Sequence, residues 1–185
     1  MIGFLDRNVL KIMTVFSASP GIRLRRKVMQ EKTGINNIVL DKTLALLLNL
    51  KILSKENGFI SLNFNNNETR ILLNYASESY NKLKQLPFKE YFMMLDIVSE
   101  LSRIRDIGDV YLFGSYSKLI FTEESDIDIA VISDEVDRKL VNKAAKKLDK
   151  FFKKKIELHF FTKEFHKNKR DPLVREILQN GIKLI

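Results

Sequence analysis

DVYLFGSYSKLIFTEESDIDIAVI, residues 109–132, is the most informative stretch of this 185-residue chain. It begins with an apolar run that predicts a strand, and Gly114 and Ser115 follow where that strand ends. A short helical segment and a polar turn lead to a second predicted strand that contains Asp126 and Asp128. Because side chains alternate along a strand, the two carboxylates share one face and apolar side chains occupy the other.

Two carboxylates at this spacing are typical of a divalent-metal site. Their Cα atoms lie roughly 7 Å apart, from a rise of about 3.3 Å per residue, so both side chains can reach one ion or a pair of ions. Without a cation the two acids repel each other, which shifts their pKa values. Mg²⁺ prefers oxygen ligands and shares its shell with substrate phosphates. We therefore expect Mg²⁺ or Mn²⁺ here, with a phosphate close to the Gly114 backbone and the Ser115 hydroxyl and N–H.

This pattern resembles the signature of the DNA polymerase β-type nucleotidyltransferase superfamily, especially its minimal members. Their signature is Gly-Ser, a short basic helix and then Ser-Asp-x-Asp. The matching positions in this chain are Gly114, Ser115, Ser125, Asp126 and Asp128. Lys118 stands where the family often has a basic residue, and Leu119 stands where it commonly has glycine. The resemblance covers about residues 88–185.

The resemblance implies a mixed sheet with helices and a metal-dependent transfer of a nucleoside monophosphate. It implies that an NTP, which we expect to be ATP, is bound through Gly114, Ser115, Lys118 and Ser125. An acceptor hydroxyl would attack the α-phosphorus in line and release pyrophosphate. Many minimal members pair with a helical toxin, so the resemblance also implies a partner of that kind. The acceptor itself is not readable from the residues.

Glu157 is the predicted third carboxylate. It stands in KIELHFF, where apolar residues alternate with Glu157 and His159. An acid inside an otherwise apolar strand is costly unless it is paired or metal-bound. By resemblance, Glu157 completes an acidic triad with Asp126 and Asp128, and it either ligates the metal or helps to activate the acceptor hydroxyl. The alternative is an edge-strand glutamate that faces water. We interpret His159 as structural.

Residues 1–64 predict three short helices and a hairpin. Helical periodicity runs over 6–17, with Asp6 as the expected N-cap, over 23–32, and to about residue 50 from an expected N-cap at Asn36 or Asn37. The Asn57-Gly58 pair then predicts a tight hairpin turn. This order resembles a winged helix-turn-helix domain, which often binds DNA. The expected phosphate contacts are the basic residues Arg23, Arg25, Arg26, Lys27, Lys42, Lys51 and Lys55.

The charge distribution supports a polyanion partner for the first half of the chain. Residues 1–87 hold 13 Lys and Arg against 6 Asp and Glu, a balance of +7, whereas residues 88–185 hold 19 against 17, a balance of +2. The third helix of the winged-helix region carries few basic or amide groups, so we expect backbone contacts more than base reading. The alternatives are a generally lysine-rich surface and a protein-binding or dimerisation module.

Other features bound the remaining interpretation. Residues 65–105 predict two helices divided at Pro87, which form a helical connector or, as alternatives, a homodimer seam or a packing shoulder for the next domain. The lysine run at 143–155 is interpreted as the solvated face of a helix, or else as a basic shelf for a nucleic-acid acceptor. The absence of cysteine excludes disulfides and thiol nucleophiles. No apolar run approaches the length of about 20 residues needed to cross a bilayer, and no signal peptide is evident, so we expect a cytoplasmic protein without a membrane segment.

The sequence thus predicts an α/β (α+β) protein with a winged helix at 1–64, a helical connector at 65–105 and a nucleotidyltransferase domain at 106–185. We expect a Mg²⁺-dependent nucleotidyltransferase, in the manner of the antitoxin of a toxin–antitoxin pair. The alternative from another class is a DNA-binding transcriptional regulator whose transferase-like domain binds only a nucleotide or a partner protein. A third hypothesis is a scaffold that dimerises through the helices of 66–105.

Overall fold

The computed structural model describes residues 6–185, which divide into two compact units, one of residues 6–92 and one of residues 93–185. Residues 1–5 lie outside the described residues. The predicted 1–64 domain and the N-terminal segment that we considered for a signal peptide both begin there. Across residues 6–185, none of the helices combines the length and the apolar character needed to span a bilayer.

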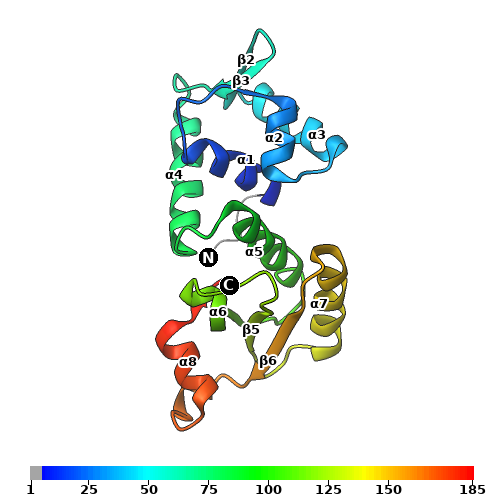
Figure 1. The fold of residues 1–185 in the computed structure, drawn as a ribbon, viewed down its shortest axis with the longest axis vertical. Coiled ribbons are helices and arrows are strands. Elements are labelled where there is room, and N and C mark those ends of the chain that lie inside the picture. Colours follow the sequence, from blue (N-terminus) through cyan, green and yellow to red (C-terminus); the bar gives the residue numbers. More distant parts are fainter. Residues whose placement is uncertain (1–5) are drawn as a thin grey trace. The chain divides into compact units, whose positions relative to one another are not determined.

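The unit of residues 6–92 combines helices with a small antiparallel sheet (Figure 1). Its elements are α1 (Arg7–Ser17), β1 (Leu24–Arg25), α2 (Arg26–Thr33), α3 (Asn37–Asn49), β2 (Leu53–Glu56), β3 (Phe59–Leu62) and α4 (Asn67–Lys82). The strands lie in the order β1–β3–β2. α5 (Phe88–Leu101) carries the chain from this unit into the next.

Capping side chains fix where these helices begin. The Asp6 carboxylate accepts hydrogen bonds from the backbone N–H groups of Asn8 and Val9, at 2.9 and 3.2 Å, which confirms the predicted N-cap of α1. The Asn36 side chain accepts from the N–H of Ile38 in the same way and starts α3. α4 packs against α1. Much of the predicted connector therefore belongs to the same compact unit as the first helix.

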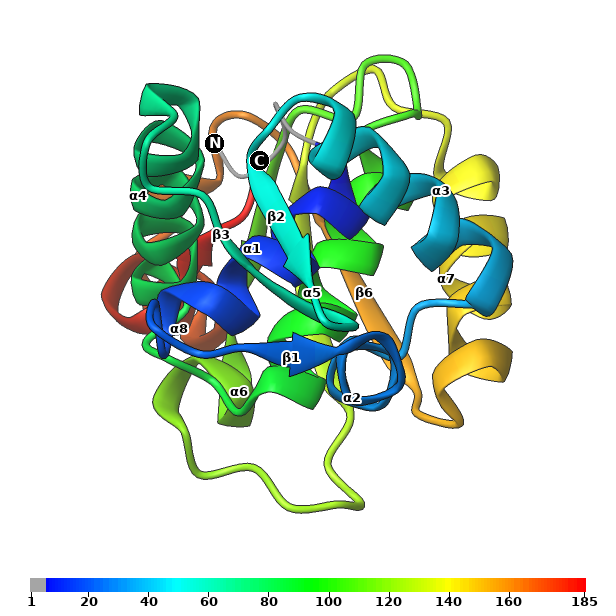
Figure 2. The ribbon, with the colours of Figure 1, turned by 90° about the horizontal axis from the view of Figure 1, so that it is seen from above.

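The predicted hairpin forms as the sequence indicates. Asn57 and Gly58 have φ of +51° and +78°, the left-handed values that a tight hairpin turn requires. The alternation of Ile60, Leu62 and Phe64 predicts one buried strand face; Ile60 and Leu62 are buried, but β3 ends at Leu62 and Phe64 is exposed. The prediction of a helix over 23–32 was wrong at its start, because Leu24 pairs with Ile60 and adds β1 to the sheet. Figure 2 shows the hairpin and β1 from above.

The unit of residues 93–185 is built on a mixed sheet in the order β6–β5–β4–β7. Its elements beyond α5 are β4 (Asp109–Leu112), α6 (Gly114–Lys118), β5 (Ile127–Ile132), α7 (Arg138–Phe152), β6 (Ile156–Phe161), the 3-10 helix η1 (Phe165–Lys167), α8 (Pro172–Asn180) and β7 (Ile182–Lys183). β5 and β6 run parallel, and β4 pairs antiparallel with both β5 and β7.

The central strand β5 is polar only near its start. Ile127, Ile129 and Val131 are fully buried on one face. The opposite face carries Asp128 and then Ala130, which is fully buried in a cluster with Phe113 of the β4 end and Ile177 of α8. Along β5, polar side chains on this face are therefore confined to the start of the strand, beside the end of β4 and the start of β6.

Candidate active site

Strand register brings two of the predicted carboxylates together. Asp128 of β5 and Glu157 of β6 are direct partners in the parallel ladder, so their side chains leave the same face of the sheet. Asp126 precedes β5 by one residue and lies two positions before Asp128, on the same side. The N–H of Phe113 donates to the Asp128 carbonyl at 3.1 Å and seats the end of β4 beside them.

Position 114 requires glycine, because the Asp128 carboxylate leaves no room there for a side chain. Its φ is +67°, and a Cβ atom placed on it would lie 2.0 Å from Asp128 Oδ2. The Asp128 carboxylate therefore fills the space that any other residue would need for its side chain. The sequence suggested glycine here for close phosphate approach, and the structure adds that Gly114 seats a predicted metal ligand.

The short helix α6 follows at once and holds Ser115 and Lys118. The helix ends at Leu119, whose φ of +60° and ψ of +30° are left-handed, so a leucine makes the turn for which the family commonly uses glycine. A leucine in this conformation costs about 1–2 kcal/mol. Lys118 Nζ lies 2.8 Å from Glu176 Oε1 of α8. An ion pair thus holds the predicted nucleotide-binding lysine to the C-terminal helix.

The loop before Asp126 is fixed by hydrogen bonds. Ser125 Oγ accepts from the Thr122 N–H at 2.8 Å, so this predicted nucleotide-binding hydroxyl closes the turn. Lys154 Nζ donates to the carbonyl oxygens of Thr122, Glu123 and Ser125 at 3.4, 2.6 and 3.4 Å. Lys154 therefore clamps the loop that presents Asp126.

Lys155 is a site residue that sequence reasoning missed. Its Nζ lies 3.1 Å from Asp126 Oδ2 and 2.7 Å from Glu157 Oε2. The lysine run at 143–155 was interpreted as one helix face, but α7 ends at Phe152 and Lys153 turns the chain with φ of +54°. The available signal was the spacing of Lys155 and Glu157, since residues two apart on a strand share a face.

The electrostatics of the cluster reflect this arrangement. Burial raises the pKa of Asp128, and the neighbouring Glu157 and Asp126 carboxylates raise it further, against the lowering effect of His159 and Lys155. The hydrogen bond from Lys155 lowers the pKa of Glu157. Hydrogen bonds to Glu157 and Asp126 raise the pKa of Lys155 above its ordinary value. Asp126 and Glu157 thus share the Lys155 ammonium at hydrogen-bond distance, whereas Asp128 is influenced by His159 more than by Lys155.

The donor set fits a divalent cation, because carboxylate oxygens are the ligands that Mg²⁺ and Mn²⁺ prefer. Burial is the largest cause of the raised pKa of Asp128, and the smaller contribution, repulsion by Glu157 and Asp126, is one that a bound cation would relieve. As they stand, the side chains of residues 6–185 form no group of three His, Cys, Asp or Glu positioned to hold a metal. Lys155 lies instead between Asp126 and Glu157.

The predicted DNA-contact arginines are engaged inside their own unit. Arg26 makes a two-pronged ion pair with Asp41, at 2.7 and 3.0 Å, and also contacts Asn37. Arg23 lies 3.1 Å from Glu56 Oε2, and the guanidinium groups of Arg23 and Arg25 lie over the Phe59 ring. The remaining predicted contacts are exposed: Lys27, Lys42, Lys51 and Lys55.

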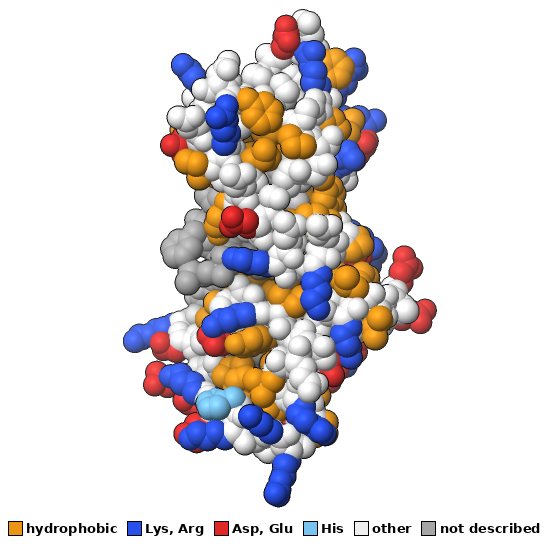
Figure 3. Space-filling model, turned by 90° about the vertical axis from the view of Figure 1, so that its left-hand side faces the viewer, with side chains coloured by type: hydrophobic (Ala, Val, Ile, Leu, Met, Phe, Trp, Pro, Cys, Tyr) orange, Lys and Arg blue, Asp and Glu red, His pale blue; other side chains and the backbone are white. Residues whose placement is uncertain are grey.

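The outward face of α3 is more apolar than a base-reading helix requires. Its exposed large side chains are Ile38, Val39 and Leu46, with Leu50 just beyond the helix. On the molecular face drawn in Figure 3, basic and acidic side chains are interleaved and do not gather into one patch. The face drawn in Figure 3 therefore gives the predicted polyanion partner no support beyond the charge balance of the sequence.

Comparison with known families identifies the second unit. Residues 95–185 match the family model described as polymerase beta, nucleotidyltransferase. This part of the chain is therefore a polymerase β-type nucleotidyltransferase domain, as the pattern at 109–132 predicts. The match begins within α5, before the predicted boundary at residue 106. A comparison with curated proteins gave no match.

Two solved structures are similar to part of the chain. One is described as "Crystal structure of the toxin-antitoxin with AMP-PNP"; it is 26% identical, and the match covers 50% of this chain and 72% of that chain, with a TM-score of 0.39. The other is a toxin-antitoxin MntA-HpeT mutant; it is 24% identical, and the match covers 45% of this chain and 64% of that chain, with a TM-score of 0.33. Similarity at this level assigns no partner to this chain.

Proposed function

We propose that residues 93–185 catalyse the divalent-metal-dependent transfer of a nucleoside monophosphate, with ATP as the expected donor, to an acceptor hydroxyl. The observation that carries this proposal is the register that places Asp128 beside Glu157, with Asp126 on the same face and Gly114 against the Asp128 carboxylate. The family match of residues 95–185 supports the same reaction class.

In this proposal, Asp126, Asp128 and Glu157 hold Mg²⁺ or Mn²⁺, which when bound neutralises charge on the phosphates. The Gly114 backbone and the Ser115 hydroxyl hold the β- and γ-phosphates, and Lys118 adds positive charge from the end of α6. The acceptor oxygen bonds to the α-phosphorus while the bond to pyrophosphate breaks. Glu157 would complete the ligand set of the metal or, as the alternative role, would take the acceptor proton.

The test is transfer in cell extract with NTPs labelled at the α-phosphorus, in the presence of Mg²⁺ or Mn²⁺. We expect label on a macromolecule with wild type and none with the Asp126→Asn/Asp128→Asn double variant. The labelled band would name the acceptor, and a helical toxin partner is one candidate. Transfer that survives the double substitution would contradict the proposal. Metal-dependent nucleotide binding without transfer would favour a regulator that senses nucleotide.

We also propose that the first unit contains a winged helix that contacts the DNA backbone. Its element order, with β1 paired to β3 beside the β2–β3 hairpin, supports this fold. The exposed lysines Lys27, Lys42, Lys51 and Lys55 supply phosphate contacts, whereas the apolar outer face of α3 does not favour base reading. A gel shift on mixed duplex DNA should show binding that weakens with salt. No binding at low salt would contradict this second proposal.

Homodimerisation through the helices of 66–105 stays a prediction. α4 packs against α1 within its own unit, although Ile71 of α4 remains exposed. A solution mass that is the monomer's at every concentration would remove this dimer and the scaffold hypothesis with it.

A further inference from the structure

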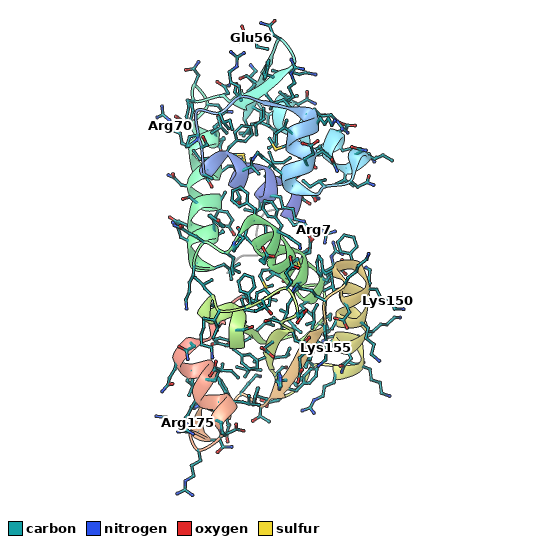
Figure 4. All side chains as sticks on the ribbon, viewed as in Figure 1. Arg7, Glu56, Arg70, Lys150, Lys155 and Arg175 are labelled. Atoms are coloured by element: carbon teal, nitrogen blue, oxygen red, sulfur yellow. The ribbon has the colours of Figure 1, made fainter. Side chains whose placement is uncertain are left out.

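Lys155 places an ammonium group where two predicted metal ligands meet. Its Nζ donates to Asp126 Oδ2 at 3.1 Å and to Glu157 Oε2 at 2.7 Å. All three side chains retain solvent contact, with relative exposures of 59% for Lys155, 40% for Asp126 and 42% for Glu157. Figure 4 labels Lys155 beside β6. The ammonium is therefore held by charge and hydrogen bonds in a place that solvent ions can reach.

The backbone fixes Lys155 opposite these acids. The Lys155 carbonyl accepts the N–H of Ile127 at 2.9 Å, which ties it to the residue between Asp126 and Asp128. On the other side, the N–H of Ile156 donates to Asp149 Oδ1 at 2.7 Å and anchors the start of β6 to α7. Bonds on both sides thus hold the Lys155 backbone, whereas its exposed ammonium is held by the two carboxylates.

The neighbouring Lys154 serves a different purpose. Its ammonium binds carbonyl oxygens of residues 122–125, which are dipoles of fixed structure, whereas Lys155 binds ionised carboxylates. A divalent cation at the carboxylates would not compete for the turn carbonyl oxygens that bind Lys154. The partners of Lys155 are the oxygens that a divalent cation would also claim, so an ammonium and a metal ion compete for them.

We propose that Lys155 is an internal competitor of the catalytic metal. Its ammonium bridges Asp126 and Glu157 in the metal-free protein and leaves at least one of them when a divalent ion binds. Lys155 thereby sets the metal concentration at which the site fills. Before the metal binds, its ammonium reduces the repulsion between the carboxylates. This inference rests on the metal site of the proposed function, and Lys155 acts in it as a positioning residue.

The test is a Mn²⁺ titration of the full chain without nucleotide, with free Mn²⁺ followed by electron paramagnetic resonance. We expect Lys155→Met to bind Mn²⁺ more tightly by roughly 3- to 30-fold, the range of two exposed ion pairs. Lys155→Arg keeps the charge and should stay within about 2-fold of wild type. The control is Lys150→Met, which removes an exposed lysine of α7 (Figure 4) and should also stay within about 2-fold.

A second readout is the rise in melting temperature on saturation with Mn²⁺, which should be larger for Lys155→Met than for wild type. Unchanged or weaker Mn²⁺ affinity in a folded Lys155→Met would overturn the role of Lys155 and leave the metal site standing. Absence of Mn²⁺ binding in both wild type and Lys155→Met would overturn the metal site as well. Should Lys155→Met not fold, Lys155→Gln carries the same expectation, and unfolding of both would contradict a displaceable lysine.

Discussion

Charged side chains are used differently in the two units. In residues 6–92, acids and bases pair one to one, as in Arg26 with Asp41 and Arg23 with Glu56. In residues 93–185, Asp126, Asp128 and Glu157 crowd onto one sheet face around a single lysine. A one-to-one ion pair balances its own charge and is typical of a structural contact, whereas three acids beside one ammonium keep an excess of negative charge and favour a ligand cation.

The largest expected effect comes from removing one carboxylate of the crowded set. Asp128→Asn should lower transfer by at least about 100-fold, since a lost metal ligand removes several kcal/mol of charge stabilisation in the transition state. The measurement is transfer of labelled nucleotide under saturating metal.

The fold of Asp128→Asn should survive, for a reason specific to this site. The pKa of Asp128 is raised in the folded protein, so its ionisation costs stability as pH rises from the ordinary value toward the folded one. Near neutral pH the asparagine should leave the melting temperature unchanged or higher. A large drop in melting temperature would show that Asp128 supports the fold and would weaken the contrast between the units.

A second prediction compares two glycines that have nearly the same φ angle. Gly114 has φ of +67° with Asp128 Oδ2 2.0 Å from an added Cβ, whereas Gly34 has φ of +64° and open space around it. Gly114→Ala should displace the carboxylate and reduce transfer by roughly 10- to 100-fold, with about 1–3 kcal/mol of destabilisation. Gly34→Ala should cost about 1 kcal/mol and leave transfer intact.

Urea unfolding and the transfer assay on both alanine variants would separate the effect of backbone strain from that of the steric contact between an added Cβ and the Asp128 carboxylate. Equal losses of transfer in the two variants would contradict the role assigned to Gly114, because backbone strain alone would then explain both.

A third prediction concerns the leucine that ends α6. Leu119 is left-handed and 46% exposed, so Leu119→Gly relieves strain with little loss of packing. We expect a gain of up to about 1 kcal/mol in the free energy of unfolding, since strain relief of about 1–2 kcal/mol is partly offset by glycine's flexibility. Chemical denaturation measures it, with Lys153→Gly at a second left-handed position as a matched case. Destabilisation of Leu119→Gly would show that the leucine side chain packs usefully.

The smallest expected effect concerns the exposed ion pair between Arg26 and Asp41. The hydrogen bond from Arg26 lowers the pKa of Asp41, so the stability that this pair adds is present above the ordinary carboxyl pKa and is lost as pH falls through the lowered one. Arg26→Gln should return the Asp41 pKa toward its ordinary value, measured by NMR titration. An unmoved pKa would mean that the pair does not form in solution.

Local patterns predicted much of the fold and of the site. The hairpin followed from Asn57-Gly58, the caps of α1 and α3 from Asp6 and Asn36, and the carboxylate face from alternation around Asp128. Each of these signals lies within a few residues of the feature that it predicts. The metal-binding and nucleotide-binding roles of these residues stay predictions.

Features that depend on distant partners were not predictable. β1 exists because Leu24 meets Ile60 across the sheet, and a two-residue strand has no periodicity to read. The contact of Gly114 with Asp128 joins two strand ends. Lys154 and Lys155 leave the helical pattern because α7 ends at Phe152, and a continuous lysine run conceals that end. The contacts of Lys154 and Lys155 depend on their position directly before β6.

The most direct test of nucleotidyl transfer compares two positions of label in the donor. Wild-type protein would be incubated in extract with Mg²⁺ and ATP labelled either at the α-phosphorus or at the γ-phosphorus, with Asp128→Asn and Lys150→Met alongside. We predict α-label on the acceptor with wild type and Lys150→Met and none with Asp128→Asn, with no γ-label on that acceptor beyond what the extract alone gives. Transfer of γ-label that depends on Asp128, or α-label that persists in Asp128→Asn, would contradict a nucleotidyltransferase built on these carboxylates.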